Sequence, residues 1–395
     1  MSSPGVTTPA DSAGRPAWQR VGLLLFAVGW GANHFVPLLL VYRARLALDA
    51  AALALLFGMY ALGLVPGLLL AGPVSDRRGR RAVVLPAACV ALAASAVLGA
   101  GGGSYAALLA GRLAYGLGAG AAMSAGTAWL VELSRDVPAS GPRRATIALS
   151  AGFGLGPLAS GVLGQYAPAP AVVPYAIHAA LLAAILAIAW RAEDAGERAP
   201  PGRLLRIELD PAGWRSFARG VAPMAPFVFG FPALVLAALP GMLGGALGAA
   251  PIAYTGVLAV IMLGAGVLVQ PITRRFEPTR ASRLGLAVGA AGTLLGVVTV
   301  ALQVPALLLL VAPILGAAYG VCMTAGLQAV QRLARPDARG GITGLYLVLT
   351  YVGFAGPYLL ALAARATAPT VALAITAGLA VAAALVLRPP DGPTG

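Results

Sequence analysis

Long apolar runs, separated by short polar connectors, follow one another along almost the whole chain. A membrane-spanning helix needs about 20 predominantly apolar residues, because it must cross roughly 30 Å of hydrocarbon and satisfy its own backbone hydrogen bonds there. Glycine, proline and charged residues divide the runs into predicted helices at residues 18–42, 50–72, 82–100, 105–131, 145–165, 171–190, 221–239, 251–272, 283–301, 304–330, 341–363 and 367–387. The pattern predicts an all-α membrane protein with twelve transmembrane helices.

The polar segments divide this array into domains. Residues 1–17 form a polar tail that we expect to be disordered, and residues 388–395 form a second tail. Residues 191–220 are the one long polar stretch inside the chain, and we interpret them as a linker between two six-helix bundles at 18–190 and 221–387. The first apolar run exceeds the roughly 7–15 apolar residues of a signal segment, so we expect it to be retained.

Composition supports membrane insertion, and charge predicts the orientation. The mean hydropathy is +0.87, 59% of the residues are hydrophobic and 10% are charged. The net charge of +14 comes from arginines, nearly all of which fall in the connectors and tails on one predicted side, whereas Arg43, Arg45 and Arg365 fall on the other. Arginine-rich loops stay in the cytoplasm. We therefore expect both termini to be cytoplasmic in a multi-pass protein of the plasma (inner) membrane, and this distribution argues against nucleic-acid binding.

The two halves of the chain are related in sequence. A shift of 200 positions without a gap superimposes identical residues, among them nine that lie between positions 116 and 157 of the first half. These nine are Gly116, Gly120, Met123, Ala125, Gly126, Leu133, Arg135, Gly156 and Pro157. The second half carries the same residues at 316, 320, 323, 325, 326, 333, 335, 356 and 357. A duplicated six-helix unit explains this match, so we expect two six-helix pseudo-repeats.

The connector between the second and third predicted helices carries a charged glycine motif. It reads Gly72, three residues, Asp76 and Arg77, one residue, Gly79, then Arg80 and Arg81. With the twelve helices and the repeat, this motif resembles the signature of the major facilitator superfamily. The resemblance covers essentially the whole chain and implies the major facilitator fold. It also implies a substrate site between the halves that is exposed alternately to either side.

We expect this motif to act as a conformational latch, formed by Gly72, Asp76, Arg77, Gly79, Arg80 and Glu132. Gly72 permits a close helix approach and Gly79 a tight reversal. The resemblance implies that Asp76 docks at the N-terminus of helix 341–363, near residues 340–343, and that Arg80 bridges to Glu132. The alternative is that the arginines only enforce topology, which we favour for Arg78 and Arg81.

The fifth predicted helix carries a glycine–proline motif at Gly152, Gly156, Pro157 and Gly161. It resembles the signature of drug:proton antiporters within the superfamily and departs from it only at Ser160. Proline kinks the helix, while glycines admit a close neighbour. The motif favours export. Residues 356–357 repeat part of it, so duplication of the six-helix unit is an alternative explanation for the motif.

Titratable residues are scarce inside the predicted spans. None of the 13 acidic residues falls at the middle of a span. Asn33, His34 and Arg112 lie at similar depth and could form a polar layer for proton coupling or substrate binding. The alternatives are a histidine that fastens its helix by hydrogen bonds and an arginine that snorkels or bonds to carbonyls. His178, on the usually peripheral sixth helix, is a weaker candidate.

The helices that face the central cavity in this superfamily supply mainly aromatic and methionine side chains. Those we expect at the cavity are Trp30, Met123, Phe227, Phe229, Tyr319, Met323 and Gln328. Such a lining suits a moderately apolar small molecule, although core packing explains each residue individually.

Together these features predict proton-coupled efflux of small amphiphilic or drug-like compounds by alternating access. The alternative is a facilitator or symporter that imports a small metabolite, and Arg112 makes a monoanion conceivable. An enzyme would need a cluster of nucleophiles, metal ligands or acids, and a channel is disfavoured by the repeat and the latch. We expect no cofactor and no metal. The expected partners are the lipid bilayer, a small-molecule substrate and protons, with the protein as a monomer.

Overall fold

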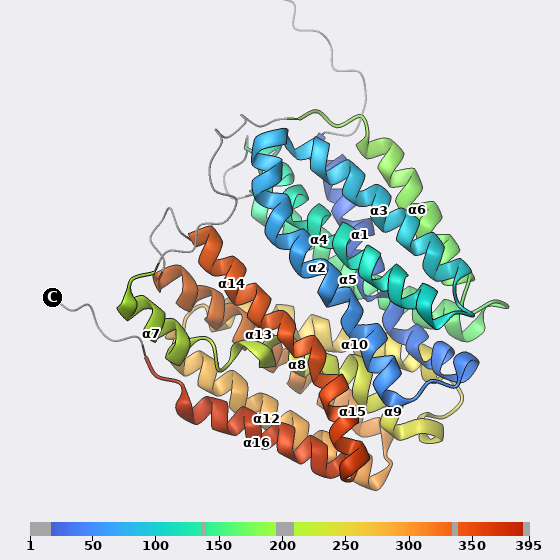
Figure 1. Cartoon of the computed structure of the whole chain (residues 1–395), viewed down its shortest axis with the longest axis vertical. Helices are drawn as coiled ribbons and strands as arrows, with labels where there is room; N and C mark the ends of the chain where they lie inside the picture. The colour runs from blue at the N-terminus through green and yellow to red at the C-terminus, as the bar shows by residue number, and fades with distance from the viewer. Residues whose placement is uncertain (1–16, 136, 138–139, 195–208, 334–338, 390–395) are drawn as a thin grey trace, which may run out of the picture.

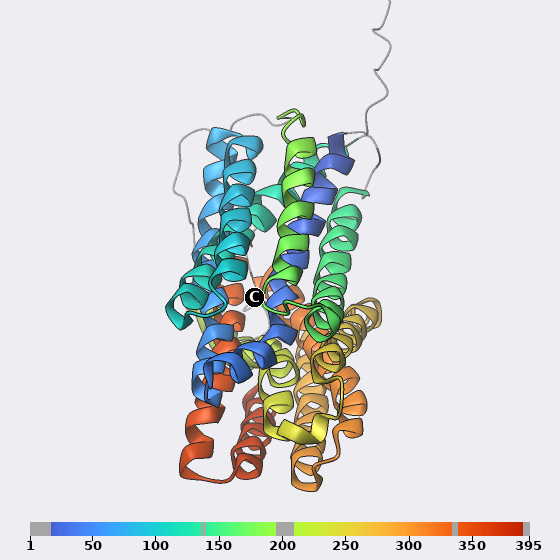
Figure 2. The same ribbon diagram turned by 90° about the vertical axis from the view of Figure 1, so that its right-hand side faces the viewer.

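The computed structural model describes residues 17–135, 137, 140–194, 209–333 and 339–389, and every regular element among them is helical. The helices form two groups, which Figures 1 and 2 show as a blue-to-green group and a yellow-to-red group. The first group contains α1 Ala17–Leu46, α2 Ala50–Arg78, α3 Arg80–Ala100, α4 Tyr105–Glu132, α5 Ser140–Tyr166 and α6 Val173–Ala189.

The second group has more interruptions. Its first segment joins α8 Ala225–Ala233, the π-helical turn Leu234–Ala238, α9 Leu239–Leu243 and the 3₁₀ turn Gly244–Leu247. The remaining helices are α10 Pro251–Leu268, α11 Gln270–Thr273, α12 Pro278–Leu302, α13 Leu308–Leu333, α14 Arg339–Tyr351, α15 Gly356–Ala366 and α16 Pro369–Val386, with 3₁₀ turns at Pro305–Leu307 and Val352–Ala355.

The described residues include eleven helical segments that are long and apolar enough to cross a membrane, and the 17-residue α6 is a shorter apolar helix. These twelve segments confirm the prediction of an all-helical, multi-span protein. Three predicted helices are not continuous. A turn at Val269 divides the helix predicted at 251–272 into α10 and α11. The π-helical turn interrupts the helix predicted at 221–239, and the 3₁₀ turn before Pro357 interrupts the one predicted at 341–363. Proline at the start of α15 lacks the N–H that would continue the α-helical ladder.

The helix predicted at 145–165 begins five residues earlier, at Ser140. The added residues include Arg143 and Arg144. A prediction based on runs of apolar residues leaves these two charged residues out of the helix. The Arg144 guanidinium lies 3.8 Å from the centre of the Trp18 ring on α1. A cation–π contact thus lets this arginine extend the helix at the membrane edge.

Part of the predicted linker is also helical. Helix α7 spans Pro211–Gly220, and Asp210 caps it by accepting a hydrogen bond of 2.6 Å from Gly213 N. Phe217 on this helix is buried, whereas Arg215 and Arg219 are exposed. Figure 1 shows α7 at the edge of the second group. Residues 195–208 of the linker lie outside the described residues.

The two ends of the molecule differ in their charged residues. The arginine-rich face contains the end of α2 and the start of α3, with Arg77, Arg78, Arg80 and Arg81. The opposite face contains the end of α1 and the connector to α2, with Arg43, Arg45 and Asp49.

Glycines bring helices into backbone contact in both groups. A Cβ atom on Gly116 of α4 would lie 2.1 Å from Tyr60 O of α2. A Cβ atom on Gly316 of α13 would lie 2.1 Å from Met262 O of α10. Any side chain at either glycine would force these backbones apart. Glycines at corresponding sequence positions therefore make the same kind of close contact in each group.

Candidate functional site

A cavity of about 930 Å³ lies between the two groups of helices. Residues of α2 and α4 line one wall, and residues of α13 and α14 line the other. Asp76 in the last turn of α2 and Gly340 in the first turn of α14 both line it, so the cavity reaches the arginine-rich face. Its lining mixes aliphatic side chains with polar ones such as Ser124 and Thr127.

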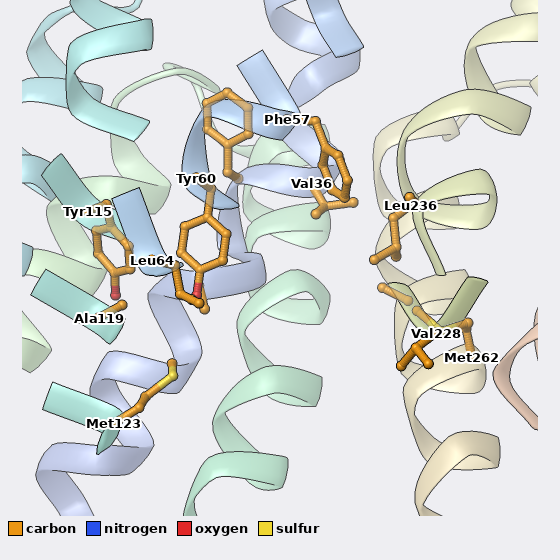
Figure 3. Close-up of a cluster of buried hydrophobic side chains, with 14 of the residues drawn as sticks. Val36, Phe57, Tyr60, Leu64, Tyr115, Ala119, Met123, Val228, Leu236 and Met262 are labelled. Carbon is orange, nitrogen blue, oxygen red and sulfur yellow. The ribbon is translucent and has the colours of Figure 1, made fainter. Parts of the chain in front are cut away.

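Met123 is the member of the predicted lining that borders this cavity. Figure 3 shows Met123 with Tyr60 and Tyr115 on neighbouring helices of the first group, apart from Val228, Leu236 and Met262 of the second group. The cavity reaches Tyr351 at its deep end. The first-group wall of the cavity belongs to α2 and α4. Close backbone contacts at glycines such as Gly116 fix the positions of these two helices relative to each other.

An aromatic cluster lies beyond the deep end of the cavity. Phe57 of α2 stacks on Phe354 of the second group with ring centres 4.9 Å apart, and Phe229 of α8 stacks on Tyr351 at 4.6 Å. The cluster comprises Phe57, Tyr60, Phe229, Tyr319, Tyr351 and Phe354. Since it joins the two groups by ring contacts, it separates the cavity from the opposite face.

The sequence analysis named Phe229 and Tyr319 but missed Phe57, Tyr60, Tyr351 and Phe354, which with them form a contact between the halves. Aromatic residues near the middle of the second and eleventh predicted helices were the available signal. Their pairing could not be predicted because it depends on the register between two helices nearly 300 positions apart in sequence.

Polar contacts join the groups at three places on the opposite face. Arg43 Nη1 of α1 donates to Gly241 O of α9 over 2.5 Å. Arg365 of α15 forms an ion pair with Asp49, the N-cap of α2.

The third contact links α5 to the start of α10. The side chain of Gln165 donates to Ala249 O at 3.3 Å and accepts from Ile252 N at 3.0 Å. The opposite face is thus closed by contacts from three different helices of the first group.

Helices α5 and α10 also cross with almost no space between them. A Cβ atom on Gly256 of α10 would lie 2.6 Å from Pro157 O of α5, and one on Gly161 would lie 3.1 Å from Gly256 Cα. Pro157 and one glycine of the predicted helix-5 motif, Gly161, therefore form part of the contact between the two groups. The other two, Gly152 and Gly156, pack instead against the α1 backbone, where a Cβ would lie 2.3 Å from Phe26 O and 2.1 Å from Trp30 O, respectively.

The charged glycine motif forms the turn between α2 and α3. Gly79 has φ of +94°, a conformation that favours glycine, and a Cβ on Gly72 would lie 3.1 Å from Ser124 Oγ of α4. Arg80 donates to Glu132 Oε1 from Nε at 3.0 Å and from Nη2 at 2.8 Å. The structure therefore places Arg80 against the acid at the end of α4, as the resemblance implied.

Asp76 lies elsewhere than the resemblance implied. Its carboxylate forms an ion pair with Arg80, one turn away on the same side of the molecule. Gly340, Gly341 and Thr343 at the start of α14 line the same cavity as Asp76. The predicted contact with the N-terminus of α14 is not formed in this structure, because the cavity separates the two helix ends.

A contact at this turn was missed by sequence reasoning. Asp194, just after α6, accepts hydrogen bonds from Arg80 N at 3.0 Å and Arg81 N at 3.3 Å. A carboxylate at a helix N-terminus satisfies N–H groups that have no partner within the helix, so Asp194 caps α3. Arg81 Nη2 also donates to Trp190 O at 2.7 Å. The start of the linker is thereby attached to the charged turn.

Arg112 is buried inside the first group and has 1% of its surface exposed. It donates to Leu56 O at 3.3 Å and Phe57 O at 3.4 Å, and its guanidinium lies 4.4 Å from the Phe35 ring centre and 4.6 Å from that of Tyr60. Its Nη1 atom is buried without a partner. This geometry corresponds to the carbonyl-bonded alternative, with cation–π contacts in addition.

The two histidines lie together within the first group. The ring centre of His34 is 5.6 Å from that of His178. Trp30 Nε1 donates to His34 Nδ1 at 3.2 Å, which leaves the buried His34 Nε2 without a partner. His178 bridges Ser95 Oγ at 2.8 Å and Ala27 O at 3.0 Å, so it fastens α6 to α3 and α1. Asn33 is partly buried on α1.

The remaining predicted lining residues lie in the second group. Phe227 packs against Phe231 with ring centres 5.6 Å apart, and Met323 O accepts from Tyr346 Oη at 3.4 Å. Gln328 Nε2 donates to Arg274 O at 3.2 Å. These contacts lie within the second group, and they fit the alternative of core packing.

Comparison with protein families identifies the chain's class. The family model of the Major Facilitator Superfamily matches residues 21–357. The match covers most of the chain, so the protein belongs to this superfamily of membrane transporters. No curated protein matches the sequence.

Solved structures of transporters share the fold at low sequence identity. A peptide transporter POT in complex with sulfate has a TM-score of 0.77 and 14% identity, over 94% of this chain and 93% of that one. The nucleoside transporter NupG has a TM-score of 0.70 and 13% identity, over 93% of this chain and 97% of that one. At these identities the likeness establishes the fold alone.

Proposed function

We propose that this protein is a secondary transporter that exports a small amphiphilic compound in exchange for protons by alternating access. The observation that carries this proposal is the cavity between the two groups, which reaches the arginine-rich face while contacts close the opposite face. A transporter must present its site to one side at a time, and one open and one closed end is what a single state of that cycle requires.

The moving units are the two groups of helices, which we take to be six-helix pseudo-repeats at 18–190 and 221–387. The matching glycine contacts at Gly116 and Gly316 support this division. The arginine-rich face is the cytoplasmic one in this proposal, because loops rich in arginine are retained on that side. The structure then corresponds to an inward-facing state.

The lining of the cavity favours an amphiphilic substrate. Leu68, Leu69 and Val348 offer apolar contacts, while Ser124 and Thr127 offer hydroxyl groups. A sugar would need more polar partners, and a polyvalent ion would need several charges of the opposite sign. The charged side chains of the cavity wall, Asp76 and Arg80, are already paired with each other.

Proton coupling has few candidate groups. Each carboxylate that the structure describes lies at a helix end or in a connector. Asp76 borders the cavity and is the acid best placed to exchange protons with the arginine-rich face. His34 is buried among Trp30, Tyr175 and His178. The glycine–proline motif of α5 supports export rather than import.

The test is reconstitution into proteoliposomes with an imposed pH gradient. Candidate compounds come from a survival screen of an efflux-deficient bacterial host that expresses the chain. Proton movement driven by a compound from this screen supports antiport. Transport of the compound without any proton movement would contradict it.

A facilitator or symporter that imports a small metabolite is the second candidate. Arg112 keeps a buried, unpartnered Nη1, but it lies inside the first group and does not line the cavity, so its position adds no support for a monoanion. The titles of the solved structures with this fold name peptide and nucleoside transporters. Uptake of a labelled metabolite by intact cells, with no resistance phenotype, would favour this candidate over export.

A further inference from the structure

A second, smaller cavity of about 430 Å³ forms a groove between α2 and the segment from α14 to α15. Its walls are almost wholly apolar, and Tyr351 and Tyr358 are the lining residues whose side chains carry a polar atom. Its other walls include Ala54, Leu62 and Val352. A hydrophilic ligand has almost nothing to bind in this groove.

The groove borders the surface that the bilayer covers. Leu62 and Val352, which line it, expose 62% and 52% of their surface. Both lie within membrane-spanning segments, so the medium in contact with them is hydrocarbon. Hydrocarbon chains from the membrane can therefore enter the groove.

The groove also adjoins the large cavity. Val65, Val348 and Tyr351 line both spaces. A molecule in the groove can therefore place one end among the polar residues of the large cavity. On the other side of the molecule, the tight contact of Gly256 with Pro157 leaves no comparable space between α5 and α10.

We propose that this groove binds the alkyl chain of a single-chain amphiphile, whose polar head lies in the large cavity. The substrate then enters from the bilayer, between α2 and the segment from α14 to α15. This inference rests on the proposed transport function and narrows its substrate class. Along α2 the groove extends from Ala54 to Pro66. At 1.5 Å per residue this distance is roughly 18 Å, enough for an alkyl chain of about a dozen carbons.

Photo-crosslinking tests the site without relying on transport. The probe is a dodecyl amphiphile with a diazirine on its chain, bound to the full-length protein in phospholipid nanodiscs. Mass spectrometry of peptides then locates the cross-links. We expect them within residues 54–66 and 348–358, and we expect unlabelled dodecyl amphiphile to compete them away.

Two variants fill the groove, and one matched variant leaves it open. Ala355→Phe adds a ring at an exposed position of the lining, and Gly58→Leu adds a side chain where a Cβ would lie an ordinary 3.5 Å from Phe354 O. Leu359→Phe changes an exposed residue of α15 outside the lining. Both filling variants should lose the cross-links, whereas Leu359→Phe should retain them.

Three results would overturn the inference. The first is labelling spread evenly over the lipid-facing surface. The second is retention of the cross-links in both filling variants. The third is groove labelling by a diazirine phospholipid that the dodecyl amphiphile cannot displace, which would identify a resident lipid instead. Transport without groove labelling contradicts this inference alone, whereas groove labelling without transport of any compound contradicts the proposed function alone.

Discussion

Arg365, in the last turn of α15, forms an ion pair with Asp49, the residue that caps α2. The other carboxylate oxygen of Asp49 accepts a hydrogen bond of 2.8 Å from Ala52 N. One acidic side chain therefore begins a helix of the first group and ties that helix to the second group. This double contact closes the opposite face next to the lipid-facing groove.

Replacing Asp49 by asparagine separates these two roles. Asparagine caps helices about as well as aspartate, but it cannot form the ion pair with Arg365. We expect Asp49→Asn to fold normally and to shift the population toward a state open at the opposite face. Faster modification of cysteines placed on that face measures this shift. Unchanged modification rates would contradict a closing role for the pair.

The same contact predicts a dependence on pH. The Ala52 N–H and the Arg365 guanidinium hold the pKa of Asp49 below its ordinary value. A lowered pKa means that the contact is fully present above the ordinary pKa of an aspartate and is lost as pH falls through the lowered value. Acidification should open the opposite face in the wild type but have no such effect in Asp49→Asn.

Asp76 lies at the mouth of the cavity, where it pairs with Arg80. We expect Asp76→Asn to abolish transport while expression remains normal, because the neutral amide can neither exchange a proton nor dock as an anion at the start of α14. The measurement is the transport rate in proteoliposomes. Arg78→Gln, at an exposed residue of the same turn, is the control and should retain transport. Wild-type rates in Asp76→Asn would remove this residue from the mechanism.

The pair of Arg80 and Glu132 should stabilise the first group. The Arg80 and Glu132 side chains have 14% and 13% of their surface exposed, so the loss of one partner leaves a largely buried charge. We expect Glu132→Gln to lower the free energy of unfolding by roughly 1–3 kcal/mol. Thermal unfolding in detergent measures this change, with Arg78→Gln again as the control. Equal melting temperatures in all three proteins would mean that the pair contributes no stability.

The contact of α5 with α10 depends on the absence of a side chain at Gly256. A methyl group there would lie 2.6 Å from Pro157 O, and such overpacking costs about 1–3 kcal/mol. Gly256→Ala should therefore lower the melting temperature and reduce transport. Gly264 lies on the same helix, and a methyl group there would have no other atom within 4 Å, so Gly264→Ala should affect neither property. The opposite ranking of the two variants would contradict the importance of this contact.

The helices could be predicted from the sequence because runs of apolar residues are a local property. The predictions failed locally where proline or arginine altered a helix, at the turn before Pro357 and in the first turn of α5 with its Arg144. Neither feature changes the number of membrane segments. Each changes where a helix bends or begins.

The site could be predicted only in part. The resemblance implied that Arg80 lies beside Glu132, and the structure has this contact. It could be predicted because the motif fixes which residue of the turn is the arginine. The pairing of Asp49 with Arg365 joins residues 316 positions apart, and no periodicity in the sequence predicts a contact between residues so distant. Arg112 could not be assigned from its depth alone, since its carbonyl and ring partners depend on how α1, α2 and α4 pack.

In the proposed cycle the two groups of helices move so that the cavity opens to one face at a time. Distances between spin labels at both faces measure this motion. One pair is Arg78→Cys with Gly340→Cys on the arginine-rich face, and the other is Ala50→Cys with Ala368→Cys on the opposite face. Both are made in a protein in which Cys89 and Cys322 are replaced.

We expect two populations in which the distances change in opposite directions, one pair lengthening as the other shortens. A change of pH or of substrate should shift the protein from one population toward the other. Distances that stay fixed under every condition, or that lengthen and shorten together at both faces, would contradict the proposed motion.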